Sequence, residues 1–486
     1  MKPLSELLAK AGIAGVAGVG EVRVGSITTD SRKAMPHSLY IAVPGVSANG
    51  AEFIPDALKA GASAIVCSET VAETLHADVP IIGVADVRAA VAALAAAFYP
   101  NMPAFMVAVT GTDGKTSTAD FTRQLFTLSG NAAASFGTLG LISPLRELNA
   151  AFPANNTSPE PILLHRTLQQ LAEGKVQHVA MEASSHGIDQ KRLDGVKLRA
   201  AAFTNLSRDH LDYHGTMEAY FAAKQRLFDT LLPAGATAVL AADMAHFAAV
   251  EAVCTQRGHR ILSFGRNGND YRIISITPHA LGLSTLLQIH GKEYTLDLPL
   301  YGEFQVYNML TALGLAEGCG LDAHVLMAQL PKLQGVRGRL ERVAELKNGA
   351  VAFVDYAHTP AALEKILRCL RPHTQGKLRV VFGCGGDRDT GKRPEMGKVA
   401  IAHADHVIVT DDNPRSESPA AIRRAILAAA PGAEEIDDRK RAILHAVAQC
   451  EEGDVLVVAG KGHEETQIIG SETIPFSDAK ILREAA

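Results

Sequence analysis

Two glycines, a lysine and two hydroxyl residues follow an apolar run in the segment VAVTGTDGKTS, Val107–Ser117. The apolar run predicts a strand, and the glycines predict a tight turn that leads into a helix. In such a loop the backbone N–H groups face an anion, Lys115 reaches the outer phosphates of a nucleotide and Thr116 approaches a magnesium ion. The loop is a short form, G-x-x-G-K-T, because Val109 stands where the longer pattern has its first glycine. A phosphate site is therefore predicted, and a simple glycine turn beside a solvated lysine is the alternative.

Acidic, imidazole and amine side chains follow in the next part of the chain. Glu182 ends HVAME, which we take as the second strand of the central domain, where a carboxylate could meet a nucleotide-bound magnesium ion. His210 and His214 lie one helical turn apart, a spacing that can bind a metal. The H-E-x-x-H signature of zinc enzymes is missing, so surface histidines are the alternative. Lys224 lies between apolar residues at helical spacing, which by itself indicates a lysine whose stem covers apolar surface.

Charged loops follow the strongest apolar runs of the last third of the chain. The runs LRVVF, HVIVT and DVLVVAG lead into GGDRDTGKR, DDNPRSE and GKGHEETQ, and Asp355 and His358 follow another run in VDYAHTP. The carboxyl ends of parallel strands meet at one edge of a sheet, so these loops predict one crevice for a small, multiply charged substrate. Asn308 and Arg339 add polar groups near the preceding domain boundary.

These loops require an α/β fold with three domains. Residues 1–100 mix short strand-like runs with Ala-rich helical runs and end at the break YPNMP, which predicts a small α/β domain. Strands alternate with helical segments over residues 101–334, which predicts a central nucleotide-binding domain with a mostly parallel sheet. Glycines and charges interrupt the apolar pattern between Leu330 and Val343, and a C-terminal Rossmann-like α/β domain is predicted over residues 335–486.

Composition excludes several classes of protein. The chain has 486 residues, of which 47% are hydrophobic and 20% charged, and its net charge of −5 offers no broad basic field for nucleic acid. The six cysteines include no C-x-x-C pair, which argues against a disulfide framework and fits the cytoplasm. The longest apolar stretch, AAVAALAAAF, is too short to span a membrane, and Glu6 and Lys10 interrupt the N-terminal apolar run of a would-be secretory signal. We expect a cytoplasmic monomer.

In this order, the segments GTDGKTS, EASSHG, NLSRDHLDYHG, AAKQRLF, DYAHTP, DNPR and GKGHE resemble the motifs of Mur ligases over nearly the whole chain. The resemblance implies a ligase that uses ATP and Mg²⁺ to add meso-2,6-diaminopimelate to UDP-N-acetylmuramoyl-L-alanyl-D-glutamate through an acyl phosphate, in peptidoglycan precursor synthesis. A folylpolyglutamate synthase, which shares the short phosphate loop, and a phosphate-loop kinase or nucleotide switch are the alternatives. The segment TTDSRKAMPHSLYIAVPG argues against the former because it resembles the uridine-binding domain of Mur ligases.

The resemblance also implies roles for single residues. Lys115, Glu182, His210 and Lys224 would be catalytic, and Lys224 would become carbamylated, which turns a cation into a carboxylate-like ligand. Magnesium would be bound by Thr116, Glu182, His210 and Lys224. ATP would be bound by Gly111, Thr112, Asp113, Gly114, Lys115, Thr116, Ser117, Asn308, Arg339, Asp355 and His358. Asp113 stands where relatives commonly carry Asn, so we expect its carboxylate to point away from the triphosphate or to act through magnesium.

The two remaining substrates would be held by separate sets of residues. The UDP-sugar peptide would contact Ser31, Asn156, Thr157, Ser158, Ser184, Gln190 and Arg192. Diaminopimelate would contact Arg388, Asp412, Asn413, Pro414, Arg415, Gly460 and Glu464. Diaminopimelate carries a carboxylate that lysine lacks, and an arginine such as Arg415 can bind it in two-point fashion, while Glu464 would accept from the distal ammonium. A strong preference for diaminopimelate over lysine is therefore predicted.

Overall fold

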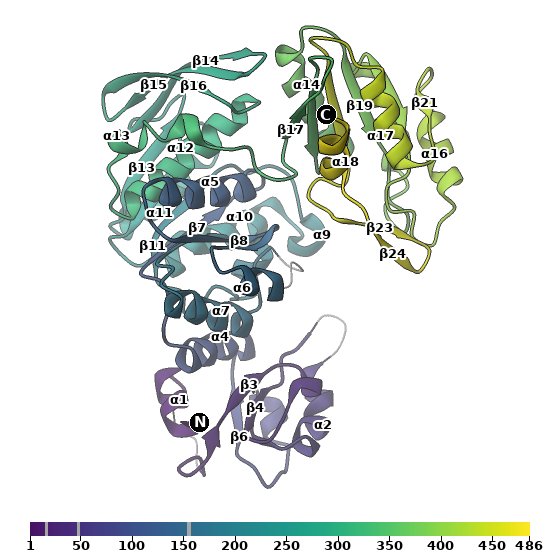
Figure 1. The fold of residues 1–486 in the computed structure, drawn as a ribbon. Helices are drawn as coiled ribbons and strands as arrows, with labels where there is room; N and C mark the ends of the chain where they lie inside the picture. The colour runs from purple at the N-terminus through teal and green to yellow at the C-terminus, as the bar shows by residue number, and fades with distance from the viewer. Residues whose placement is uncertain (15–17, 46–48, 153–156) are drawn as a thin grey trace. The chain divides into compact units, whose positions relative to one another are not determined.

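The computed structural model describes residues 1–14, 18–45, 49–152 and 157–486. The chain forms two compact units, Met1–Ser263 with Thr311–Ala323 and Phe264–Leu310 with His324–Ala486. Each unit contains mostly parallel sheets with helices on their faces (Figure 1), which confirms the predicted α/β class. No helix among the described residues is long and apolar enough to cross a bilayer.

The N-terminal part of the first unit is a four-stranded parallel sheet. Its elements are β1 (Lys2–Pro3), α1 (Leu4–Lys10), β2 (Arg23–Val24), β3 (Ser26–Thr28), β4 (Ser38–Ile41), α2 (Ile54–Lys59), β5 (Ala62–Ser68), α3 (Glu69–Ala72), β6 (Ile81–Val84) and α4 (Val87–Phe98). The strand order is β3-β4-β5-β6. Side chains alternate along β4: Leu39 and Ile41 pack with α1 and α4, whereas Tyr40 packs with α2 on the other face. The predicted strands of this region are thereby confirmed.

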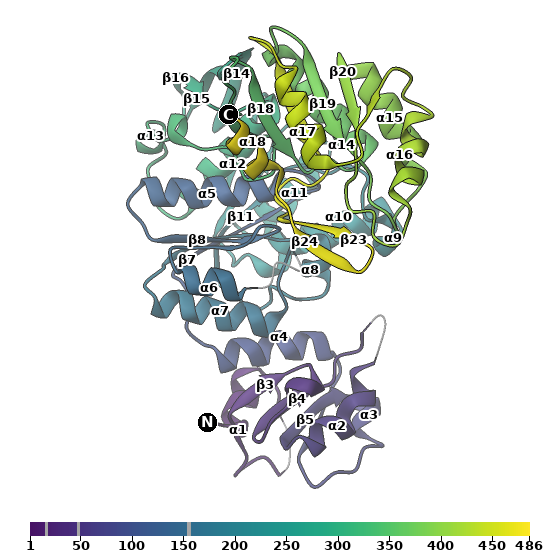
Figure 2. The same ribbon diagram turned by 45° about the vertical axis from the view of Figure 1, so that its right-hand side comes forward.

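The central sheet of the first unit carries the phosphate loop. Its elements are β7 (Phe105–Thr110), α5 (Lys115–Leu128), β8 (Ala133–Gly137), β9 (Gly140–Ile142), α6 (Arg146–Ala151), α7 (Pro161–Glu173), β10 (His178–Glu182), α8 (Ser185–Asp189), β11 (Leu198–Phe203), α9 (Leu211–His214), α10 (Met217–Arg226), β12 (Thr237–Ala241), α11 (Phe247–Gln256) and β13 (Arg260–Gly265). The strand order β12-β11-β7-β10-β8-β9 places β7 between β10 and β11, all three parallel. Helix α5 covers one face and α7 the other (Figure 2).

One expectation about this sheet was wrong. HVAME, strand β10, is not the second strand after the N-terminal part but the fourth, because β8 and β9 precede it. Strand β8 has the sequence AASFG, whose small residues have weak strand propensity and gave no apolar run to recognise.

The second unit holds three consecutive antiparallel strands, a six-stranded sheet and a two-stranded hairpin. Its elements are β14 (Tyr271–His279), β15 (Gly282–Ile289), β16 (Lys292–Leu298), β17 (Glu341–Glu345), β18 (Val351–Asp355), α14 (Pro360–Leu370), β19 (Leu378–Phe382), α15 (Lys392–His403), β20 (His406–Val409), α16 (Pro419–Leu427), β21 (Glu434–Glu435), α17 (Arg439–Ala448), β22 (Val455–Ala459), β23 (Thr466–Ile469), β24 (Glu472–Pro475) and α18 (Asp478–Ala485). Helices α12 (Glu303–Gly318) and α13 (Ala323–Leu326) lie between β16 and β17 in the chain.

The six-stranded sheet has the order β17-β18-β22-β19-β20-β21, and only β17 is antiparallel to its neighbour. Alternate strand residues face opposite helix layers. Phe353 and Val380 pack with α14, α15 and α16, whereas Val354 and Val381 pack with α17 and α18. Both faces are apolar, as a parallel sheet between two helix layers requires. The carboxyl ends of β18, β19, β20 and β22 therefore carry the charged loops, as predicted.

Candidate active site

The phosphate loop connects β7 to α5 and is shaped by the residues that follow β11. Gly111 has φ +147°, and a Cβ atom there would lie 2.0 Å from Thr204 Oγ1, so only glycine fits. The backbone N–H groups of Thr112 and Asp113 donate to the backbone and side-chain oxygens of Asn205, both at 2.9 Å. The loop then enters α5, whose first-turn N–H groups can bind an anion. Strand, turn and helix thus form as predicted, which supports a phosphate site.

Two lysines meet at one carbonyl group of this loop. Lys115 Nζ donates to the carbonyl oxygens of Gly111 and Thr112, at 2.9 and 2.8 Å. Lys224 Nζ, from α10, donates to the carbonyl oxygen of Gly111 at 2.7 Å and lies 4.5 Å from the ring centroid of Tyr220. Burial, and in second place the charge of Lys115, lowers the pKa of Lys224 to about 6. Lys224 is therefore mostly a neutral amine at pH 7, the form that reacts with carbon dioxide to give a carbamate.

Glu182 lies beside the start of α5. Its Oε2 accepts from Thr116 Oγ1 at 3.0 Å, and its Oε1 accepts from the Thr138 backbone N–H at 2.7 Å. Gly137 makes room for this carboxylate, because a Cβ atom there would lie 1.9 Å from Glu182 Oε1. A carboxylate and a hydroxyl side by side beside a phosphate loop are ligand types that magnesium prefers. The residues present therefore fit a nucleotide-bound magnesium ion.

The histidines give no such support for zinc. His210 has φ +53° and precedes α9; its Nε2 lies 3.5 Å from Asp209 Oδ2, and its side chain is 46% exposed. Within the described part of the chain, no three His, Cys, Asp or Glu side chains gather closely enough to hold a metal ion.

Four of the residues expected to bind the UDP-sugar peptide form one hydrogen-bonded group next to Glu182. Ser158 Oγ donates to the Glu182 carbonyl oxygen at 3.0 Å and lies 3.1 Å from Ser184 Oγ. Arg192 donates to the Ser158 carbonyl oxygen at 3.0 Å and to Gln190 Oε1 at 2.7 Å.

The other three residues of that set are not members of this hydrogen-bonded group. Thr157 Oγ1 lies 3.4 Å from Thr138 Oγ1. Ser31 opens a turn of 3₁₀ helix, Ser31–Lys33, after β3. Asn156 lies outside the described residues.

In the second unit, three of the residues expected to contact ATP, Asp355, Arg339 and His358, lie near the end of β18. The buried carboxylate of Asp355 accepts from the backbone N–H groups of Leu340 and Ala357, each at 2.7 Å, and burial raises its pKa. The Arg339 guanidinium lies 4.8 Å from the ring centroid of Tyr356. His358 is exposed two residues later. Asn308, on α12, donates to Gln305 Oε1 at 3.0 Å.

The loops after β19, β20 and β22 come together in the second unit, as predicted. Arg415 Nη1 donates to the Gly386 carbonyl oxygen at 2.7 Å, two residues before the exposed Arg388. Asn413 Nδ2 donates to Glu464 Oε2 at 3.0 Å. Gly460 has φ +115°, and a Cβ atom there would lie 2.6 Å from Asp412 Oδ2. The loop that contains Asp412, Asn413, Pro414 and Arg415 is therefore adjacent to both of the other charged loops.

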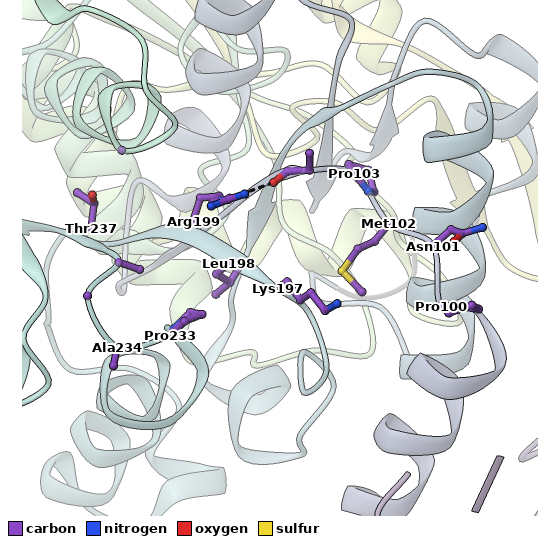
Figure 3. Close-up of a pocket in the computed structure, with 14 residues that line it drawn as sticks. Pro100, Asn101, Met102, Pro103, Lys197, Leu198, Arg199, Pro233, Ala234 and Thr237 are labelled. Atoms are coloured by element: carbon purple, nitrogen blue, oxygen red, sulfur yellow. Dashed lines mark hydrogen bonds between the residues drawn. The ribbon is translucent and has the colours of Figure 1, made fainter. Parts of the chain in front are cut away.

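A pocket of about 810 Å³ lies away from this chemistry, at the amino ends of β7, β11 and β12 (Figure 3). Its walls are the connection Pro100–Ala104, Lys197–Arg199 and Pro233–Thr237. The phosphate loop follows the carboxyl end of β7, so this pocket is at the other edge of the sheet.

Three family models match consecutive parts of the chain: the Mur ligase family catalytic domain over residues 23–99, the Mur ligase middle domain over 109–316 and the Mur ligase glutamate ligase domain over 338–462. A protein of Agrobacterium fabrum (strain C58) named UDP-N-acetylmuramoyl-L-alanyl-D-glutamate–2,6-diaminopimelate ligase is 51% identical over 469 residues, which cover 96% of this chain and 94% of that protein. The chain belongs to the Mur ligase family.

Solved structures of Mur ligases share this fold. A structure of a UDP-N-acetylmuramoyl-L-alanyl-D-glutamate–2,6-diaminopimelate ligase is 32% identical, with a TM-score of 0.73 over 98% of both chains. MurF ligase from Thermotoga maritima in complex with ADP is 20% identical, with a TM-score of 0.61 over 91% of this chain and 94% of that one, a likeness of fold alone.

Sequence reasoning missed two buried cations of this Mur ligase. Lys461 is fully buried and donates to Asn413 Oδ1 at 2.8 Å and to Glu464 Oε2 at 3.2 Å. Its place in the GKGHE motif was a signal that could have revealed it. Arg439, also fully buried, pairs with Asp478 and donates to the Ala459 carbonyl oxygen at 2.9 Å. No pattern in the sequence around Arg439 indicated this role.

Proposed function

We propose that this Mur ligase joins meso-2,6-diaminopimelate to the D-glutamate γ-carboxylate of UDP-N-acetylmuramoyl-L-alanyl-D-glutamate, with ATP as the phosphoryl donor, in peptidoglycan precursor synthesis. One observation carries the proposal: identity of 51% over almost the full length to a ligase named for this reaction. The phosphate loop beside Lys224 and Glu182 supports the ATP-dependent step, and the three adjoining charged loops of the second unit support a small charged amino acid.

The reaction needs ATP because a carboxylate is a poor electrophile at neutral pH. Transfer of the γ-phosphoryl group onto the carboxylate gives an acyl phosphate with a good leaving group, and the amine then attacks its carbonyl carbon and expels phosphate. The protein's task is to align the reactants and to offset negative charge. The N-terminus of α5 and Lys115 would bind the phosphates. Mg²⁺, held by Thr116, Glu182, His210 and a carbamylated Lys224, would supply further positive charge.

Selection of the amino acid would depend on the second unit. The Arg415 guanidinium would bind the distal carboxylate of diaminopimelate, and Glu464 would accept from its distal ammonium. Lysine has no carboxylate at this position, so it would leave a desolvated guanidinium unpaired, which costs on the order of 2–5 kcal/mol.

We also propose that residues 1–100 bind the UDP moiety, residues 101–334 bind ATP and residues 335–486 bind the amino acid, in a cytoplasmic monomer. The matches of three family models to three consecutive segments support this division. Limited proteolysis that cuts near residues 100 and 334, and light scattering on the purified protein, test the boundaries and the oligomeric state.

ADP release by the purified protein tests the reaction. With the UDP-dipeptide present, we expect ADP release to require diaminopimelate and to be slow with lysine in its place. Equal rates with both amino acids would overturn the assignment of the amino acid. ADP release that needs neither the UDP-dipeptide nor an amino acid would favour a kinase or nucleotide switch, and activity on a folate substrate would favour a folylpolyglutamate synthase.

A further inference from the structure

Lys461 belongs to the charged loop after β22 in the second unit, and its side chain is fully buried. A buried ammonium group is costly unless its hydrogen bonds are made, and a methionine could occupy a similar volume without that cost. The stability of the fold therefore does not by itself account for a lysine here. Its two acceptors indicate what it does, because both belong to the expected amino-acid site.

Lys461, Asn413 and Glu464 form a closed triangle of hydrogen bonds. Lys461 Nζ donates to Asn413 Oδ1 at 2.8 Å and to Glu464 Oε2 at 3.2 Å, and Asn413 Nδ2 donates to the same Glu464 oxygen at 3.0 Å. The Ile468 backbone N–H also donates to Asn413 Oδ1, at 3.0 Å. Two donors on Oδ1 fix the orientation of the amide, because a flipped amide would present its NH₂ group to both of them.

The triangle also determines which atom of Glu464 can meet a ligand. Oε2 accepts from both Lys461 and Asn413, whereas Oε1 accepts no hydrogen bond from any residue that the structure describes. The Glu464 side chain is 32% exposed, so Oε1 can reach a bound molecule. Lys461 itself is fully buried and cannot.

We infer that Lys461 is a positioning residue for the amino-acid site: directly and through the Asn413 amide, it orients the Glu464 carboxylate so that Oε1 can accept from the distal ammonium of the incoming amino acid. The inference rests on the proposed function, because that ammonium belongs to diaminopimelate. Without Lys461, the Asn413 amide loses one of the two donors that fix it, and Glu464 loses its ion pair. The amino-acid site should then weaken while the ATP site is unaffected.

Steady-state kinetics of Lys461→Met tests this inference. The variant keeps the length of the side chain and removes its donors. We expect its KM for diaminopimelate to rise about tenfold, the effect of losing about one buried hydrogen bond to a charged group, while the KM values for ATP and the UDP-dipeptide stay within about twofold of wild type. Lys480→Met, the same change at a lysine of α18 that is 76% exposed, is the matched control and should resemble wild type.

A purely structural role would give a different result. An unchanged KM for diaminopimelate in a folded variant would overturn the inference, and so would a similar rise in all three KM values. If Lys461→Met does not fold, Lys461→Gln, which keeps an uncharged NH₂ group as donor, takes its place. The KM for diaminopimelate is then again compared with the KM values for ATP and the UDP-dipeptide. The wild-type assay is the separate check on the proposed function: if the wild-type protein does not need diaminopimelate, the proposed function fails and the inference fails with it.

Discussion

Lys224 and Lys115 donate to the same acceptor, the carbonyl oxygen of Gly111, at 2.7 and 2.9 Å. Two ammonium groups this close repel each other, and burial disfavours the charge on Lys224 further, which agrees with its pKa of about 6. The phosphate loop therefore has one half-buried cation that can bind phosphates, and beside it the buried amine of Lys224, which can be modified.

Lys224→Met should abolish most of the ligase activity while nucleotide binding remains. We expect turnover to fall on the order of 100-fold or more, the usual effect of removing a group that stabilises the charge of a transition state. Lys224 of the wild-type protein should also yield a carbamate signal by NMR in isotopically labelled bicarbonate, and the variant should lose this signal. Lys59→Met, at an exposed lysine of α2, is the control. Full activity of Lys224→Met would contradict the assigned role.

Glu182→Gln should weaken the binding of magnesium. The amide keeps the size of the side chain but replaces one carboxylate oxygen by an NH₂ group beside Thr116 or Thr138, so a cation is bound less well. We expect turnover to fall about 100-fold and the magnesium concentration for half-maximal activity to rise. Glu173→Gln, an exposed acid at the end of α7, should change neither quantity. A variant with an unaltered magnesium titration would argue against Glu182 as a ligand.

Arg415→Ala should separate the amino-acid site from the ATP site. Loss of the guanidinium should lower kcat/KM for diaminopimelate on the order of 100-fold, with little change in the KM for ATP. The preference for diaminopimelate over lysine should largely disappear. The comparison needs both amino acids, with Arg424→Ala, an exposed arginine of α16, as the reference. If Arg415→Ala keeps the full preference for diaminopimelate over lysine, Arg415 does not bind the distal carboxylate.

The strands that carry the site could be predicted from the sequence because each is an apolar run that ends in glycine or polar residues. The phosphate loop was predicted from the same local pattern. The hydrogen bond between Thr116 and Glu182 could not be predicted, since it depends on β10 lying next to β7, a pairing that no local pattern encodes. The burial of Lys224 also required the fold, and the chemical properties of its helix alone indicated an ordinary lysine.

Breaking the buried ion pair of Arg439 and Asp478 should strongly destabilise the second unit. Both side chains are fully buried, and Arg439 Nε and Nη2 donate to the two carboxylate oxygens at 2.8 Å each. Asp478→Asn leaves a buried guanidinium without its counter-charge, so we expect a loss of about 3–5 kcal/mol in the free energy of unfolding, measured by urea denaturation. Glu484→Gln, an exposed acid of the same helix, should be close to neutral. Equal midpoints for the two variants would show that the pair contributes little.

His165 should make the first unit sensitive to acid. Its Nε2 lies 3.1 Å from the Asp194 carbonyl oxygen, which can only accept, and burial lowers its pKa below the usual value. As the pH falls below about 6.5, the unfolded chain binds a proton that the folded protein does not bind. The free energy of unfolding therefore falls by up to about 1.4 kcal/mol per pH unit, until the pH reaches the lowered pKa of His165.

His165→Gln removes this proton uptake. The difference in unfolding free energy between wild type and variant should therefore shrink or change sign between about pH 7.5 and about pH 5.5. His76→Gln, the same change at an exposed histidine, provides the comparison. A difference that does not depend on pH would contradict the neutral, buried imidazole.

Gly137 supplies no chemical group, yet the room it leaves is occupied by the Glu182 carboxylate. Even the smallest added side chain would collide with that carboxylate. A population under selection for this reaction therefore cannot replace Gly137 by another residue without displacing the Glu182 carboxylate. A compound that rests against the backbone at this point would leave the cell few ways to acquire resistance there by mutation.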